Sequence, residues 1–139
     1  MRTPRSGPFG HPRVLRQREK VEQAHIVQLL RAIGAAVYVL GTRRPRGDFH
    51  GTCQTAGLPD VLSILPRGLG VLFVEVKAVG GRLRPEQAAF RDQCGTCAES
   101  YRVHHVVGGL SEVMFHLMHL GLLKAEDVPH YRMRNESHA

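Results

Sequence analysis

Two acidic residues and a lysine lie at positions where they could bind a metal ion together. Asp60 closes the stretch 57–60, which reads GLPD, and the triplet 75–77, which reads EVK, begins fifteen positions after Asp60. Each group borders a short apolar run, so the three side chains could meet at one end of a β-hairpin. Two carboxylates held close together repel each other unless a cation lies between them. The spacing predicts a site for a hard divalent ion with an ammonium group beside it.

The hairpin itself is predicted from two apolar runs and the turn between them. Residues 61–65 and 71–74 are short and rich in β-forming side chains, and residues 66–70 contain the proline and glycines of a turn. Folding the chain there brings Asp60 level with Glu75, within about one position of register, and cross-strand neighbours have Cβ atoms roughly 4.5–5.5 Å apart. Because side chains alternate along a strand, Glu75 and Lys77 point to the same face.

A simpler alternative is that these residues are solvent-exposed charges at strand ends, with Glu75 and Lys77 forming only an ion pair. The combination with the GLPD turn argues against this alternative. A charge pair inside the apolar run VLFVEVK is also costly to place in a sheet unless it has a partner.

Helical and strand patterns surround the hairpin and complete an α/β order. We expect a helix over about 16–35, a strand over 37–40, the two hairpin strands, a helix over 85–97, a strand over 101–107 and a helix capped by Ser111 that ends near 120. The order α-β-β-β-α-β-α predicts a mixed central sheet flanked by helices. Residues 1–14 are expected to form a flexible basic arm, residues 15–120 the folded domain and residues 121–139 a polar tail. The apolar residues of the last helix are either core, which we favour, or a dimer surface.

Two further polar residues fall on apolar helix faces. Glu22 precedes Ile26 by four positions, so it lies on the buried stripe of the first helix, where a metal ion or a metal-bound water would give it a partner. The alternative is that Glu22 pairs with Arg18 in solvent. Gln87 lies on the apolar stripe of the second helix and could hold a water or a phosphate oxygen, or it could be a core glutamine bonded to backbone.

Composition favours a polyanionic partner. The 139 residues include 19 Lys and Arg against 12 Asp and Glu, which gives a net charge of +7 and a pI near 10.0; for a small domain this indicates nucleic acid. Candidate phosphate contacts are Arg43, Arg44 and Arg46 in the long loop 41–57, and Arg82 and Arg84 at the mouth of the second helix.

No apolar run is long enough for a membrane span and no secretory signal is visible, so we expect a cytoplasmic protein. The three cysteines then read as reduced thiols, with Cys94 and Cys97 in the core rather than at a zinc or redox site.

The stretches 57–60, 75–77 and 81–87 together resemble the virus-type replication-repair nuclease (VRR-NUC) domain, a PD-(D/E)xK family with the restriction-endonuclease-like fold. The resemblance covers about 21–107, and Glu22 is similar to the family's helix-one glutamate. The chain departs from the family pattern at His25, where glutamine is common, and at Arg84, where Ser or Thr is common.

The resemblance implies a metal-dependent DNA endonuclease. It would bind Mg²⁺ or Mn²⁺ through Asp60, Glu75 and the Val76 carbonyl, with Glu22 completing the site, while Lys77 and Gln87 assist catalysis. Members of this size are similar to Holliday-junction resolvases from bacteria and phages, which implies a homodimer acting on branched DNA in repair or recombination. The alternatives are a non-catalytic DNA-binding or assembly subunit with the same fold and a sequence-specific restriction-type enzyme.

Overall fold

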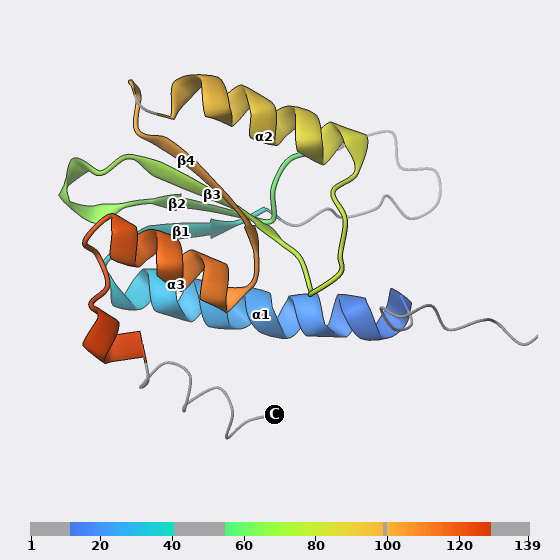
Figure 1. The fold of residues 1–139 in the computed structure, drawn as a ribbon, viewed down its shortest axis with the longest axis horizontal. Helices are drawn as coiled ribbons and strands as arrows, with labels where there is room; N and C mark the ends of the chain where they lie inside the picture. Colours follow the sequence, from blue (N-terminus) through green and yellow to red (C-terminus); the bar gives the residue numbers. More distant parts are fainter. Residues whose placement is uncertain (1–11, 41–54, 99, 129–139) are drawn as a thin grey trace, which may run out of the picture.

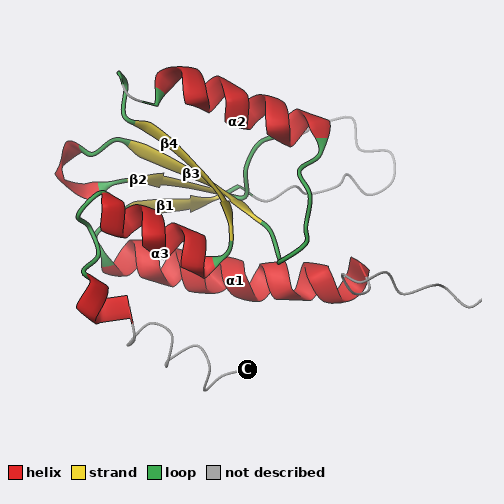
Figure 2. Ribbon diagram, viewed as in Figure 1, coloured by secondary structure: helices red, strands yellow, loops and turns green. Residues whose placement is uncertain are grey.

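The computed structural model describes residues 12–40, 55–98 and 100–128. The elements follow in the order α1 (Pro12–Ala32), β1 (Ala36–Val39), β2 (Val61–Ile64), β3 (Val71–Val76), α2 (Pro85–Cys97), β4 (Val103–Gly108) and α3 (Leu110–His119), with single 3-10 turns at Pro66–Gly68 and Ala125–Asp127. This order confirms the predicted α/β arrangement. The sheet lies between two layers of helix, with α2 on one face and α1 and α3 on the other (Figures 1 and 2).

The sheet is mixed, and its strands lie in the order β1-β2-β3-β4. β1 and β2 pair antiparallel, β2 and β3 pair antiparallel, and β3 and β4 pair parallel. The predicted hairpin is therefore confirmed, with Val61 opposite Val74 and the turn closed by a 2.8 Å bond from Leu65 N–H to the Gly70 carbonyl. The parallel pair needs a long crossover, and α2 supplies it.

The main core lies between the sheet and the layer formed by α1 and α3. α1 contributes Ile26, Leu29 and Leu30 at helical spacing, and none of the three is more than 1% exposed. They pack in one cluster with Leu72 and Val74 of β3, which are fully buried. The strand alternation that buries these two residues turns their neighbours Phe73 and Glu75 toward the opposite face.

Aromatic contacts hold α2 over that opposite face. The ring of Phe73 meets the ring of Phe90 edge-on at a centroid distance of 5.0 Å, and Phe90 also contacts His105 of β4 at 5.8 Å. Such pairs add stability beyond the area they bury. They position α2 so that its N-terminal turn lies above the carboxyl end of β3.

The end of the described chain belongs to the core rather than to a polar tail. Val113, Met114 and Leu117 of α3 are no more than 2% exposed, so these residues are core, as favoured above. Leu122 and Leu123, at 9% and 6% exposure, join the same cluster. The packed region therefore continues past residue 120, where the tail was expected to begin.

Two helix starts differ from the sequence expectation. α1 begins at Pro12, inside the segment expected to be a flexible arm, and proline is well suited to a first helical turn. α3 begins after Gly109 instead of being capped by Ser111, because acidic side chains accept from its first amides.

On α2, Cys94 is buried and Cys97 is half-buried, and both are free thiols.

Candidate active site

The hairpin register brings the two predicted acids together. Asp60 directly precedes β2, and its N–H group donates to the Val74 carbonyl at 3.1 Å, which extends the ladder by one step toward Glu75. The Asp60 side chain reaches across to β3, where Oδ2 accepts a 2.8 Å hydrogen bond from the Val76 N–H group. The predicted residue Val76 thus has a structural role already, because its amide fixes the Asp60 carboxylate beside Glu75.

Glu75 is held from two sides at one oxygen. Its Oε1 atom accepts a 2.6 Å hydrogen bond from Gln87 Nε2 and lies 3.1 Å from Lys77 Nζ. Glu75 is only 2% exposed, so these two donors offset much of the cost of burying its charge. The Lys77 backbone is also anchored, by a 3.0 Å bond from its N–H group to the Gly108 carbonyl of β4.

Gln87 connects the acid pair to the start of α2. Its Oε1 atom accepts from the Arg84 N–H group at 2.8 Å, while its amide nitrogen binds Glu75. One glutamine therefore caps the helix and orients the carboxylate, and it needs both a donor and an acceptor to do so. The structure brings together Asp60, Glu75, Lys77 and Gln87, the four residues predicted to be catalytic.

A glycine sets the distance between the GLPD turn and α2. Gly57 has a φ of +92°, and a Cβ atom placed on it would lie 2.5 Å from the Glu86 carbonyl oxygen. A side chain at this position would meet both backbone strain and a collision with the first turn of α2. Glycine therefore allows the segment that carries Asp60 to pack directly against the helix that carries Gln87.

The environment of the acids makes the charged form of each carboxylate costly. Burial raises the pKa of Asp60, although the Val76 amide and the positive charges of Lys77 and Arg84 oppose the shift. Burial and then the neighbouring Asp60 carboxylate raise the pKa of Glu75, against the opposing effect of Lys77 and Arg84. The Asp60 charge therefore opposes ionisation of Glu75, and a cation between the two carboxyl groups would relieve that repulsion.

The donor set fits a divalent ion. Within the described residues, the N–H donors of the site meet Asp60 at Oδ2 and Glu75 at Oε1, and no N–H group donates to Asp60 Oδ1 or Glu75 Oε2. In the same part of the chain, no three His, Cys, Asp or Glu side chains are grouped to share an ion. One or two carboxylates, with water and substrate oxygens in the other positions, is the usual way in which proteins bind Mg²⁺.

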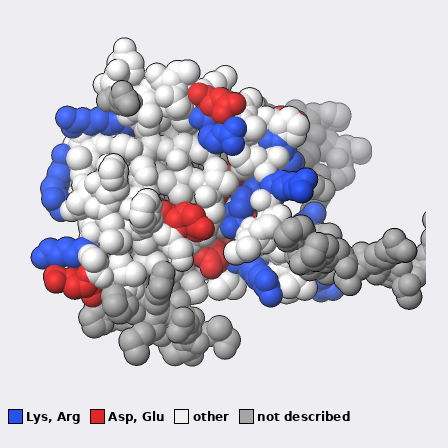
Figure 3. Space-filling view, in the orientation of Figure 1, with Lys and Arg blue, Asp and Glu red and all other residues white. Residues whose placement is uncertain are grey.

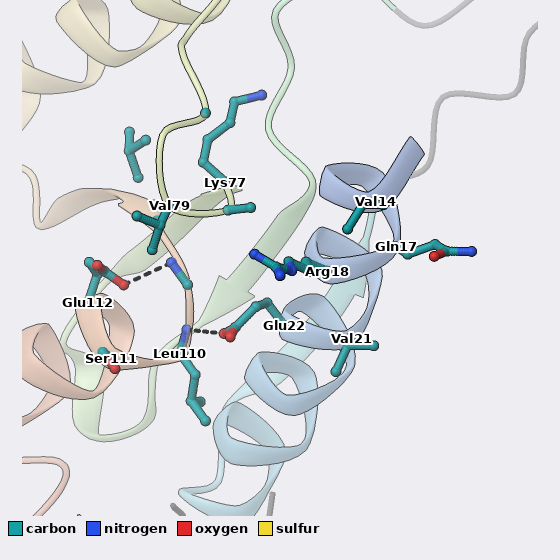
Figure 4. Close-up of a pocket in the computed structure, with 15 residues that line it drawn as sticks. Val14, Gln17, Arg18, Val21, Glu22, Lys77, Val79, Leu110, Ser111 and Glu112 are labelled. Atoms are coloured by element: carbon teal, nitrogen blue, oxygen red, sulfur yellow. Dashed lines mark hydrogen bonds between the residues drawn. The ribbon is translucent and has the colours of Figure 1, made fainter. Parts of the chain in front are cut away.

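The predicted helix-one ligand lies elsewhere. Glu22 directs its Oε2 atom to the Leu110 N–H group at 2.6 Å, so its carboxylate caps α3 (Figure 4). A second carboxylate of α1, Glu19, also approaches the end of β3, where its Oε1 atom accepts from the Ala78 N–H group at 3.4 Å. Sequence reasoning missed Glu19, although it precedes Ile26 by two helical turns and therefore shares the same buried stripe.

The predicted phosphate contacts are partly visible. Arg84 is exposed, and its charge lowers the pKa of both acids, so it lies beside the site. Arg82 is also exposed, two residues before Arg84. Figure 3 shows that Lys and Arg side chains gather on this side of the molecule, over the N-terminal half of α1 and the connection from β3 to α2. Arg43, Arg44 and Arg46 lie outside the described residues.

Comparison with known proteins identifies the family. The family model of the VRR-NUC domain matches residues 5–108. The chain belongs to the VRR-NUC family. A solved structure of a VRR-NUC domain is 27% identical, with a TM-score of 0.50, and the match covers 73% of this chain and 94% of that one. The family match confirms the resemblance, and the structural match confirms the expected fold. The VRR-NUC family is a nuclease family. The search of curated proteins found no match.

No helix in the described ranges combines the length and the apolar character that a membrane crossing requires.

Proposed function

We propose that this protein is a metal-dependent DNA endonuclease that hydrolyses phosphodiester bonds and prefers branched DNA. The observation that carries the proposal is the pair of half-buried Asp60 and buried Glu75, which separate hydrogen-bond donors hold side by side. A pair of adjacent carboxylates with raised pKa values is useful to a protein when it binds a cation. Membership of the VRR-NUC family and the net charge of +7 support a nuclease acting on a polyanion.

The cofactor in this proposal is Mg²⁺ or Mn²⁺. Asp60, Glu75 and the Val76 carbonyl would hold it, and water and phosphate oxygens would take the other positions. A divalent ion bound there lowers the pKa of a coordinated water and offsets the negative charge that develops on the phosphate.

The surrounding side chains then have separate tasks. Lys77, which is mostly shielded from solvent, stabilises negative charge next to the attacking water. Gln87 fixes the rotamer of Glu75, so that its second oxygen stays directed at the ligand. Glu19, which accepts from the Ala78 N–H group just after β3, is an additional α1 carboxylate that would orient a water.

DNA in this proposal binds mainly through its phosphates. Arg82 and Arg84 at the mouth of α2, together with Arg43, Arg44 and Arg46, supply contacts that do not depend on sequence. Affinity should therefore fall steeply as salt concentration rises. The proposal includes a homodimer, which light scattering at matched salt would test.

The deciding experiment compares cleavage of a four-way junction with cleavage of a linear duplex of the same sequences. We expect wild-type protein to cut only with Mg²⁺ or Mn²⁺, and to cut the junction faster. Asp60→Asn should bind DNA without cutting it, whereas Asp92→Asn should behave as wild type. Asp92 is a matched control because it is exposed on α2 and, among the residues that the structure describes, pairs only with the adjacent Arg91 at 3.0 Å.

The other outcomes separate the alternatives. Binding without cutting by wild type would establish a non-catalytic subunit. Cutting of linear duplex at one fixed sequence, without preference for the junction, would establish a restriction-type enzyme.

A further inference from the structure

A cavity of about 690 Å³ lies directly behind Lys77, on the side away from α2. Three segments enclose it, namely the N-terminal half of α1, the residues that follow β3, and the junction of β4 with α3 (Figure 4). Its volume is within the roughly 300–1,000 Å³ typical of small-molecule sites. Lys77 lines this cavity, and its Nζ atom lies 3.1 Å from Glu75 Oε1, so the cavity adjoins the candidate active site.

The cavity is apolar at its mouth. Val14, Val21 and Val79 line it and remain 42%, 56% and 93% exposed. Val79 lies in the tight turn after β3, which a 2.8 Å bond from Gly81 N–H to the Ala78 carbonyl closes. The exposed valine surface around the cavity is removed from contact with water only when a ligand with an apolar face enters.

The charged groups of the cavity balance, with Arg18 and Lys77 against Glu22 and Glu112, so the lining has no net positive charge to attract a phosphate. Glu22 and Glu112 both line it, and their carboxylates accept from the Leu110 and Gly109 N–H groups at 2.6 and 2.9 Å. These two bonds use the first amides of α3, which would otherwise favour an anion. An entering phosphate would meet these two negative charges as well as the positive charges of Arg18 and Lys77, so it would gain little net attraction.

An uncharged ring with polar edges fits the same groups well. Carboxylate oxygens accept hydrogen bonds from exocyclic amines and ring N–H groups of bases. Arg18 projects from α1 into the cavity (Figure 4), and its guanidinium forms no ion pair within the described residues, so it can stack on a base or donate to one. The charge of Arg18 also lies close to the mouth, where the phosphates of the same strand would pass.

We propose that this cavity receives one unpaired base of the DNA strand whose phosphate lies at Asp60 and Glu75. The inference rests on the proposed function and defines its substrate class. A base stacked inside an intact duplex does not project into a recess between α1 and the start of α3, so the protein selects DNA with a free or easily extruded nucleotide beside the scissile bond. Extrusion is least costly at mismatches, flaps and junctions, and this difference provides the selectivity.

The test measures binding of the full-length Asp60→Asn chain, which is expected not to cut. Two flap DNAs differ only at the single unpaired nucleotide, which is either a normal base or an abasic site. We expect the base-containing DNA to bind about tenfold more tightly, equivalent to about 1.4 kcal/mol. With 2-aminopurine at that position, fluorescence should rise on binding, because the cavity lining within residues 12–40, 55–98 and 100–128 contains no aromatic side chain to quench it.

Two additional substitutions locate the effect. Val21→Phe fills the cavity from an exposed position and should remove the tenfold preference, whereas Ala24→Phe should keep it. Ala24 is exposed on the same helix and does not line the cavity.

The inference is overturned if the two DNAs bind equally, or if the Val21→Phe chain retains the preference. Cleavage by wild type separates this failure from failure of the proposed function. Mg²⁺-dependent cutting without any dependence on the unpaired base would refute the cavity alone. The absence of cutting on every substrate would refute the nuclease activity.

Discussion

Gln87 offers a sharp test of the site, because one side chain joins α2 to the acid pair. Gln87→Met keeps nearly the same length and volume but removes both of its hydrogen bonds, to Glu75 at 2.6 Å and from Arg84 N–H at 2.8 Å. The bond to charged Glu75 contributes about 1.5–3 kcal/mol and the neutral bond about 0.5–1.5 kcal/mol. Because Gln87 is only 5% exposed, solvent replaces neither bond fully. We expect the free energy of unfolding to fall by about 2–4 kcal/mol.

Urea denaturation of metal-free protein measures this change. With an m-value of roughly 2 kcal/mol per molar urea, the midpoint should fall by about 1–2 M while the slope stays constant. The matched control is Gln93→Met on the exposed part of the same helix, which should change stability by less than about 0.5 kcal/mol. A Gln87→Met protein as stable as this control would show that the contact between α2 and Glu75 contributes little, and the account of the site would fail.

Three further predictions concern the acids and the end of the chain. Burial raises the pKa of Asp60 and Glu75, so protonation of these groups favours the metal-free fold, and that contribution is lost as pH rises through the raised pKa values. Metal-free Asp60→Asn should therefore be at least as stable as wild type near neutral pH, and the difference in stability should shrink on acidification. The thermal midpoint of Asp60→Asn should not rise with Mg²⁺. A wild-type thermal midpoint that is insensitive to Mg²⁺ would contradict the metal site. Glu22→Gln weakens the cap on Leu110 and should cost about 0.5–1 kcal/mol in urea unfolding, with Mg²⁺ affinity by calorimetry unchanged; a lower affinity would show that Glu22 reaches the ion. Leu123→Ala should cost about 2–4 kcal/mol, and a neutral result would place residues beyond 120 outside the fold.

The hairpin and its acids were predictable because their geometry is local. Register follows from the turn and from strand alternation, so the approach of Asp60 to Glu75 can be derived from residues 57–77 alone. Gln87 was also predictable as a site candidate, since a polar residue on an apolar helix face needs a partner. Which partner it takes depends on how α2 docks, and the contact between Phe73 and Phe90 determines that docking.

The helix-one carboxylate could not be chosen from the sequence in the same way. Glu19 and Glu22 lie three positions apart and share a helix face, so periodicity selects the face but not the turn that meets β3. Which of the two carboxylates meets β3 depends on the position of α1 along the sheet. The long-range packing of α1 with Leu72 and Val74 determines that position. The burial of Leu122 and Leu123 was missed for a similar reason, because two adjacent apolar residues in a polar segment have no period.

The hairpin places both acids and the lysine on one continuous stretch, residues 60–77. Length changes before Asp60 or after Lys77 leave the spacing of these three side chains intact. A single residue inserted within β2 or β3 would move the later side chains of that strand to the opposite face of the sheet. One acid would then point toward Ile26 and Leu30, among apolar side chains. Natural or engineered variation in length should therefore be tolerated at the borders of this stretch and eliminated inside its strands.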